Sequence, residues 1–134
     1  MKNQIYYLAR NEYSNFIFNC KDNYYIVEID GKDINEKEDF FKIMWEKFKL
    51  PMYENQTRFS WDSYLDWMRD LTWIKEDKIV LIIYNYNNFM NKEQNIKREI
   101  IDDYESCILP FWEKDVKKIV VDGKPRRFNV YLID

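Results

Sequence analysis

Three aspartates spaced four residues apart are the groups of this sequence best placed to do chemistry. They are Asp62, Asp66 and Asp70, in the stretch SWDSYLDWMRDL at 60–71. If this stretch is helical, residues four apart are neighbours, and like charges there destabilise the helix by about 0.2–0.5 kcal/mol per pair. Either a solvated face tolerates that cost, which is the usual outcome for exposed charge, or the acidic stripe has a binding partner.

Such an acidic stripe is poorly suited to catalysis or to metal binding. Glycosidase chemistry needs two carboxyl groups about 5–10 Å apart across a cleft, which one exposed helix does not form. Calcium and magnesium need more converging oxygens than the stripe supplies. The chain has no histidine and only two glycines, Gly31 and Gly123, which removes histidine-dependent catalysis, most zinc sites and a Gly-rich phosphate loop. We therefore expect no enzyme activity, no catalytic residues, no cofactor and no metal.

Length and composition indicate the class of protein. A chain of 134 residues with 19% aromatic residues suggests one domain over 1–134 with ample material for a core. The net charge of −3 argues against nucleic-acid binding. Because the start lacks a signal peptide and the run IVLIIY at 79–84 is too short to span a bilayer, a cytoplasmic protein without membrane contact is expected. Cys20 and Cys107 are isolated and are expected to be buried free thiols.

Hydrophobic periodicity and turn residues outline the elements. Helices are expected at 35–49, 60–71, 93–108 and 110–116. Strands are expected at 4–9, 15–20, 24–30, 78–84, 118–121 and 128–134. This order favours an α/β fold with a small, mainly parallel sheet packed with helices. Residues 1–23 are expected to form an N-terminal extension of antiparallel edge strands packed on the sheet, with a hairpin as one arrangement.

The helix at 60–71 has a clear start and a clear inward face. Ser60 is a good N-cap. Helical spacing places four apolar residues on the inward face, with the aspartates to one side of it. These apolar residues are Trp61, Leu65, Met68 and Leu71.

The same segment resembles the helix motif of the barstar family, small inhibitors of barnase-like ribonucleases. The family pattern is approximately Asn-Trp-Asp-Ala-Leu-x-Asp-x-Leu-x-Asp-Leu. The flanks are similar as well, with IDGKDI before a helix that ends in FKLPMY, and IVLIIY followed by NNF after the motif. The resemblance covers roughly 24–134. It implies a barstar-like fold with a small, mainly parallel three-stranded sheet.

The resemblance also implies a function and a partner. Asp62 and Asp66 match the family's two aspartates that face the enzyme, where they would stand in for RNA phosphates against Arg and Lys side chains. The expected partner is a basic extracellular-type ribonuclease or a related toxin, in an immunity or antitoxin role, with the inhibitor a monomer before complex formation. Further candidate contacts are Asp70, the third aspartate of the motif, and three aromatic residues, Trp67, Tyr53 and Trp73. The aromatic residues are candidates because Trp and Tyr are enriched at binding hot spots.

Departures from the family pattern keep an alternative open. The family has aromatic-Gly-x-Asn before the helix, whereas MYENQTRFS at 52–60 has no glycine and Ser60 stands in place of the asparagine. Loop contacts of the family therefore do not transfer to this chain. A family glutamate of the later helix aligns only loosely with Glu113. The alternative function is a barstar-fold protein–protein interaction module with a target that is not a nuclease.

Overall fold

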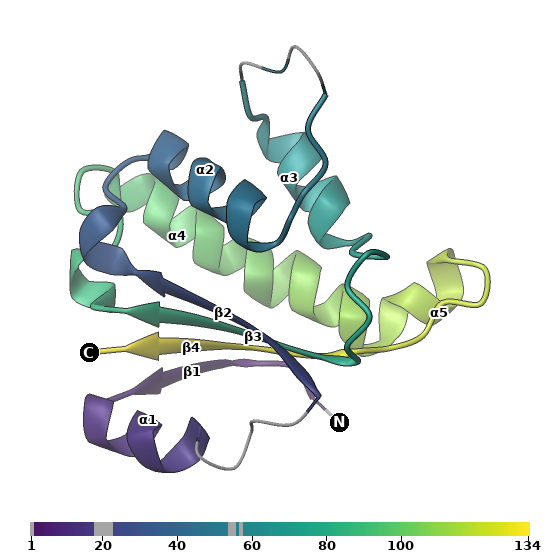
Figure 1. Ribbon diagram of the computed structural model, residues 1–134, viewed down its shortest axis with the longest axis horizontal. Helices are drawn as coiled ribbons and strands as arrows, with labels where there is room; N and C mark the ends of the chain where they lie inside the picture. Colours follow the sequence, from purple (N-terminus) through teal and green to yellow (C-terminus); the bar gives the residue numbers. More distant parts are fainter. Residues whose placement is uncertain (1, 18–22, 54–55, 57) are drawn as a thin grey trace.

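Four parallel strands form a single sheet in the order β1-β4-β3-β2 (Figure 1). The computed structural model describes residues 2–17, 23–53, 56 and 58–134. The strands are β1 (Ile5–Leu8), β2 (Tyr24–Asp30), β3 (Lys78–Tyr84) and β4 (Arg127–Ile133). Each neighbouring pair runs parallel. The predicted α/β class with a mainly parallel sheet is thereby confirmed.

The central strand β3 explains why its sequence shows no polar alternation. Ile79, Leu81 and Ile83 point into the larger core between sheet and helices. Val80 and Ile82 point to the opposite face and are equally buried there. A parallel strand covered on both faces reads as a continuous apolar run, as this one does.

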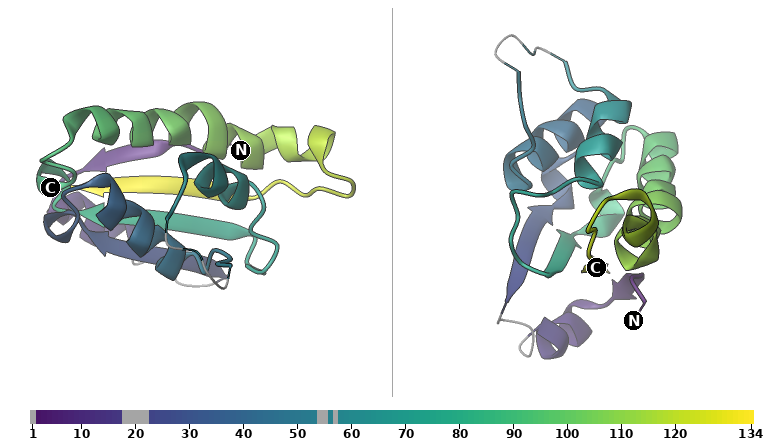
Figure 2. Two further views of the ribbon diagram at one scale, coloured as in Figure 1. Left: turned by 90° about the horizontal axis from the view of Figure 1, so that it is seen from above. Right: turned by 90° about the vertical axis from the view of Figure 1, so that its right-hand side faces the viewer.

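Helices cover the two faces of the sheet unequally (Figures 1 and 2). α2 (Lys37–Lys47), α3 (Trp61–Met68) and α4 (Gln94–Asp103) lie on the side of the larger core. On the other side lies α1 (Arg10–Ile17), whose Tyr13 packs on the smaller core. α3 therefore packs against the larger core, to which its side chains Tyr64 and Met68 belong.

The N-terminal extension differs from the expectation. β1 pairs with β4 in parallel, with Ile5 opposite Val130, so the predicted antiparallel hairpin is wrong. Residues 15–17 belong to α1, and 18–20, with Cys20, lie outside the described residues. The chain passes from β1 at one edge of the sheet to β2 at the other, with α1 between them, and such a crossover leaves the strands parallel. An aromatic-aliphatic run alone does not distinguish a strand from a helix.

The C-terminal helical segment is longer than expected. α4 continues through two π-helical segments, η3 (Tyr104–Ile108) and η4 (Phe111–Asp115), into α5 (Val116–Ile119). Pro110 keeps helical dihedral angles, φ −63° and ψ −34°, so the helices predicted separately at 93–108 and 110–116 form one continuous segment. Pro110 has no backbone N–H to donate to the preceding turn. The π-helical segments η3 and η4, on either side of Pro110, change the hydrogen-bonding pattern there. The strand expected at 118–121 is wrong, because these residues end α5 and enter a turn.

Candidate protein-binding site

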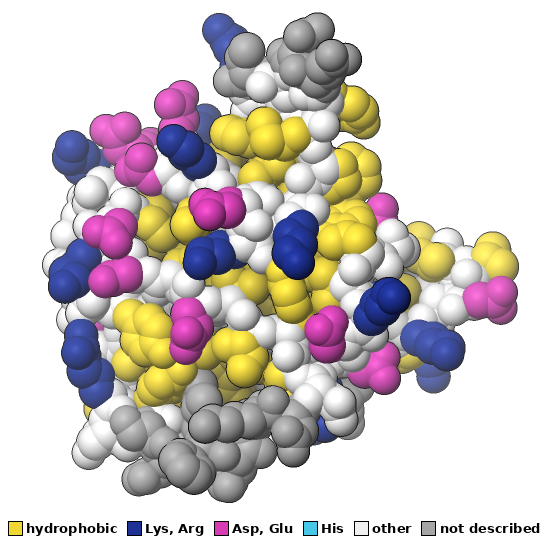
Figure 3. Space-filling model, in the orientation of Figure 1, with side chains coloured by type: hydrophobic (Ala, Val, Ile, Leu, Met, Phe, Trp, Pro, Cys, Tyr) yellow, Lys and Arg dark blue, Asp and Glu magenta, His cyan; other side chains and the backbone are white. Residues whose placement is uncertain are grey.

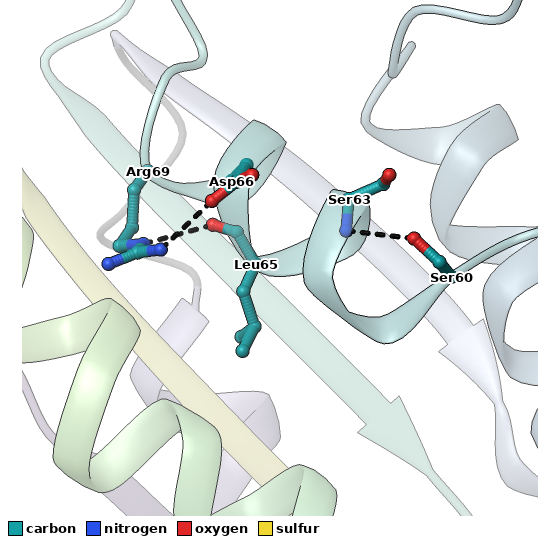
Figure 4. A network of polar contacts seen from close by, with 5 residues as sticks. All are labelled: Ser60, Ser63, Leu65, Asp66 and Arg69. Atoms are coloured by element: carbon teal, nitrogen blue, oxygen red, sulfur yellow. Dashed lines mark hydrogen bonds and ion pairs between the residues drawn. The ribbon is translucent and has the colours of Figure 1, made fainter.

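The start of α3 is fixed by a side-chain cap. Ser60 has extended dihedral angles, and its Oγ accepts a hydrogen bond from the Ser63 N–H at 3.0 Å (Figure 4). Asp62 follows in the first turn, where the free N–H groups and the helix dipole favour a negative charge. The cap thus sets the residue at which the helix begins and the rotation of every side chain that follows.

The inward face of α3 is anchored by a buried tyrosine pair. Tyr64 and Met68 are fully buried, and the hydroxyl of Tyr64 lies 2.7 Å from that of Tyr104 in η3. Burial, with Tyr104 as a further cause, raises the pKa of Tyr64 well above its usual value. Trp61 and Leu65, expected on the inward face, are only partly buried. Tyr64, which the helical spacing did not single out, is the main anchor.

The outward face of α3 presents two of the three aspartates to solvent. Asp62 is exposed, and the side chain of Asp66 is 73% exposed. Asp66 Oδ1 lies 3.1 Å from Arg69 Nη2, and Arg69 Nε–H also donates to the Leu65 carbonyl at 3.1 Å (Figure 4). An exposed pair of this kind contributes about 0–1 kcal/mol. The Asp66 carboxylate therefore stays available to a partner that offers stronger contacts.

The third aspartate has a different environment. α3 ends at Met68, and Leu71 takes the left-handed conformation with φ 48°. Asp70 thus lies in the turn after the helix, half-buried, and its carboxylate accepts the Thr72 N–H at 3.3 Å. The structure exposes Asp62 and Asp66 on α3, whereas Asp70 is half-buried in the turn that follows the helix.

The aromatic candidates divide into packed and exposed residues. Trp67 and Trp73 meet edge to face with ring centroids 6.0 Å apart, and both pack partly on the core. Trp73 Nε1–H also donates to the Phe48 carbonyl at 2.8 Å. Tyr53, in the connection before α3, is 73% exposed. Of these three side chains, Tyr53 offers the most surface to a partner.

A fourth carboxylate, which the sequence reasoning missed, lies beside α3. Asp103 at the end of α4 accepts a hydrogen bond from Trp61 Nε1–H. Burial raises the pKa of Asp103, and the Trp61 hydrogen bond opposes that shift. One turn on, the charges of Arg69, Asp103 and Asp66 all act on the half-buried thiol of Cys107, whose pKa burial raises. The acidic surface therefore runs from α3 onto α4, and helical spacing within one segment cannot reveal such a neighbour.

Other candidates lie away from this surface. Glu113, in η4, accepts the backbone N–H of Asn3 at 2.6 Å and so binds the chain's own N-terminal segment.

In the part of the chain that the structure describes, no group of three acidic, Cys or His side chains could hold a metal ion. Nor does any helix within those ranges have the length and apolar character needed to cross a membrane.

The fold and this surface define a small parallel α/β protein whose acidic helix packs against α2 and the segment from α4 to η3, with its outward face in solvent. In a comparison with protein-family models, residues 24–122 match the family described as "Barstar (barnase inhibitor)". The chain belongs to the barstar family, as the residues around α3 led us to expect. The match leaves out β1, α1 and β4. Neither the curated proteins nor the solved structures gave a match.

Proposed function

We propose that this protein inhibits a ribonuclease by placing the outward face of α3 in the enzyme's basic active site. The observation that carries the proposal is the exposure of Asp62 and Asp66 on one face of a helix whose other face is anchored in the core through Tyr64. Carboxylates pair strongly with Arg and Lys side chains that otherwise bind RNA phosphates. A rigid helix loses little conformational entropy when it binds.

The electrostatic balance supports this role. The repulsion between Asp62 and Asp66 costs about 0.2–0.5 kcal/mol. By contrast, removing one partner of a buried, hydrogen-bonded charge pair at an interface costs about 2–5 kcal/mol in general. The penalty for losing such a contact therefore exceeds the folding cost several-fold. Asp103, at the edge of the same surface, adds negative potential that attracts a basic enzyme at long range.

In this role the protein performs no reaction of its own and needs no cofactor. The partner is a basic, secreted type of ribonuclease or a related toxin, and the inhibitor acts in the cytoplasm as an immunity protein or antitoxin, as a monomer before it binds. We also propose that residues 1–134 act as one domain, since β1 pairs with β4 and Asn3 binds Glu113.

The test is an RNA-cleavage assay with two enzymes. One is barnase, which the family description names. The other is any ribonuclease that elutes at high salt from the immobilised chain after an extract of the native source has been applied. We expect the wild-type chain to inhibit and Asp62→Ala/Asp66→Ala to lose at least about a hundredfold in affinity, since two charge contacts are removed. Equal inhibition by the double variant, with the fold intact by circular dichroism, would remove the acidic helix from the mechanism.

A second candidate function is an interaction module whose target is not a nuclease. It is favoured by the glycine-free connection before α3, where Met52 and Tyr53 are 55% and 73% exposed. Capture of a single partner that cleaves no RNA, with binding that the double aspartate variant leaves unchanged, would support this function over inhibition.

A further inference from the structure

Three consecutive aliphatic side chains are exposed where α5 ends. Ile119, Val120 and Val121, here called the α5 ridge, are 70%, 44% and 90% exposed. α5 and the turn after it project beyond the end of the sheet in Figure 1, and Figure 3 shows hydrophobic side chains on this projection. Single exposed apolar residues are ordinary, but a contiguous patch on a projection indicates an interaction surface.

The backbone holds the ridge in a defined shape. Val120 N–H donates to the Val116 carbonyl at 3.0 Å, and Gly123 N–H donates to the Val120 carbonyl at 3.0 Å. Asp122 takes the left-handed conformation with φ 59°. A Cβ at Gly123 would lie 2.3 Å from the Val116 carbonyl oxygen, so the turn packs directly on α5. The outermost side chain, Val121, is therefore presented by a fixed turn.

A pocket connects the α5 ridge to the end of α3. Its volume is about 430 Å³, with Arg69 and Asp70 on the α3 side and Val120 and Val121 on the ridge side. Trp112 and Arg126 line it as well, and the Arg126 guanidinium stacks 4.7 Å from the Trp112 ring centroid. A protein that covers the end of α3 would reach the ridge across this pocket.

The exposed charges of the helix and turn that carry the ridge are mainly basic. Lys117, Lys118 and Lys124 are exposed there, and Asp122 is the exposed acidic residue of the turn. The adjoining pocket also contains Asp70 and Asp77. A segment that covers the ridge therefore needs apolar side chains with acidic neighbours. Two adjoining surfaces of opposite sign admit a partner in one orientation only.

We propose that the α5 ridge is a second contact region for the ribonuclease of the proposed function, on which this inference rests. Its occupant is an apolar segment of the enzyme surface, flanked by acidic residues and outside the basic active site. The acidic face of α3 supplies attraction to any basic nuclease, and the ridge selects among such nucleases by shape and by the reversed charge.

The test compares two sets of variants in the same RNA-cleavage assay, with the same two enzymes. Ile119→Ser/Val121→Ser removes the two most exposed apolar side chains of the ridge, and Ile26→Ser is the control, a single change at an exposed isoleucine on β2. We expect the ridge variant to inhibit at least about tenfold more weakly, because two aliphatic side chains no longer leave water on binding. The control should stay within about twofold of the wild type.

The outcomes separate this inference from the proposed function. If the wild type inhibits, the aspartate variant fails and the ridge variant inhibits like the wild type, the ridge proposal is refuted and the proposed function stands. An equal loss in the Ile26→Ser control would refute it too. If the wild type inhibits neither enzyme, the proposed function is refuted, and the ridge proposal falls with it. Lys117→Glu/Lys118→Glu should weaken inhibition as well, and improved inhibition would contradict the reversed charge.

Discussion

The Asp66–Arg69 pair gives the sharpest test of whether the acidic helix is free to bind. Arg69→Ala removes a contact of 3.1 Å with Asp66, in which the two side chains are 38% and 73% exposed, and the 3.1 Å hydrogen bond from Arg69 Nε–H to the Leu65 carbonyl. A helical pair at this spacing stabilises by about 0.2–0.5 kcal/mol, and a typical hydrogen bond by about 0.5–1.5 kcal/mol. The free energy of unfolding, measured with urea, should therefore fall by less than about 2 kcal/mol.

The effect on binding should have the opposite sign. A unit positive charge about 10 Å from a cation of the partner repels it by about 0.4 kcal/mol in water. Its removal should raise the association rate constant about twofold, and this gain should vanish at high salt. Stopped-flow mixing with a ribonuclease that the wild-type chain inhibits measures the association rate constant at low salt and at high salt.

The control keeps the change in net charge and moves it elsewhere. Lys92→Ala removes an exposed cation from the turn before α4, so a gain specific to Arg69→Ala reports a local effect on Asp66. A tenfold loss of affinity in Arg69→Ala would refute the reasoning, because it would show that Asp66 binds only when Arg69 holds it or that Arg69 itself contacts the enzyme.

Two further predictions concern the contacts that hold α3 in place. Tyr64→Phe should lower the free energy of unfolding by about 1–3 kcal/mol, because it leaves the buried Tyr104 hydroxyl without its partner. The double change Tyr64→Phe/Tyr104→Phe should cost less than the sum of the two single changes. Additive losses of stability in urea unfolding would contradict the pairing. Asp103→Asn should stabilise the protein at neutral pH while keeping an acceptor for Trp61. Since the pKa of Asp103 is raised in the folded state, its charged form costs stability above that pKa, and the cost is relieved as the pH falls toward the ordinary value of 3.8. The advantage of the variant should therefore shrink on acidification, and thermal melts that show it growing would refute the assignment.

The sequence by itself determined the local features of the site. The unbroken apolar run of β3 predicts a strand buried on both faces, and Ser60 predicts where α3 begins. Both follow from interactions within a few residues, which a sequence pattern records directly. The same locality explains why Asp62 and Asp66 were expected on one helix face.

Only the tertiary structure decided what lies beside that helix. The sequence placed Asp70 in line with the other aspartates, but the structure leaves Asp70 half-buried in the turn after α3, where its carboxylate accepts the Thr72 N–H. Asp103 comes from a helix distant in sequence, and β1 runs parallel to β4 because α1 carries the chain to the opposite edge of the sheet. Contacts between distant segments depend on how whole elements pack, and the periodicity of a single segment carries no information about its neighbours.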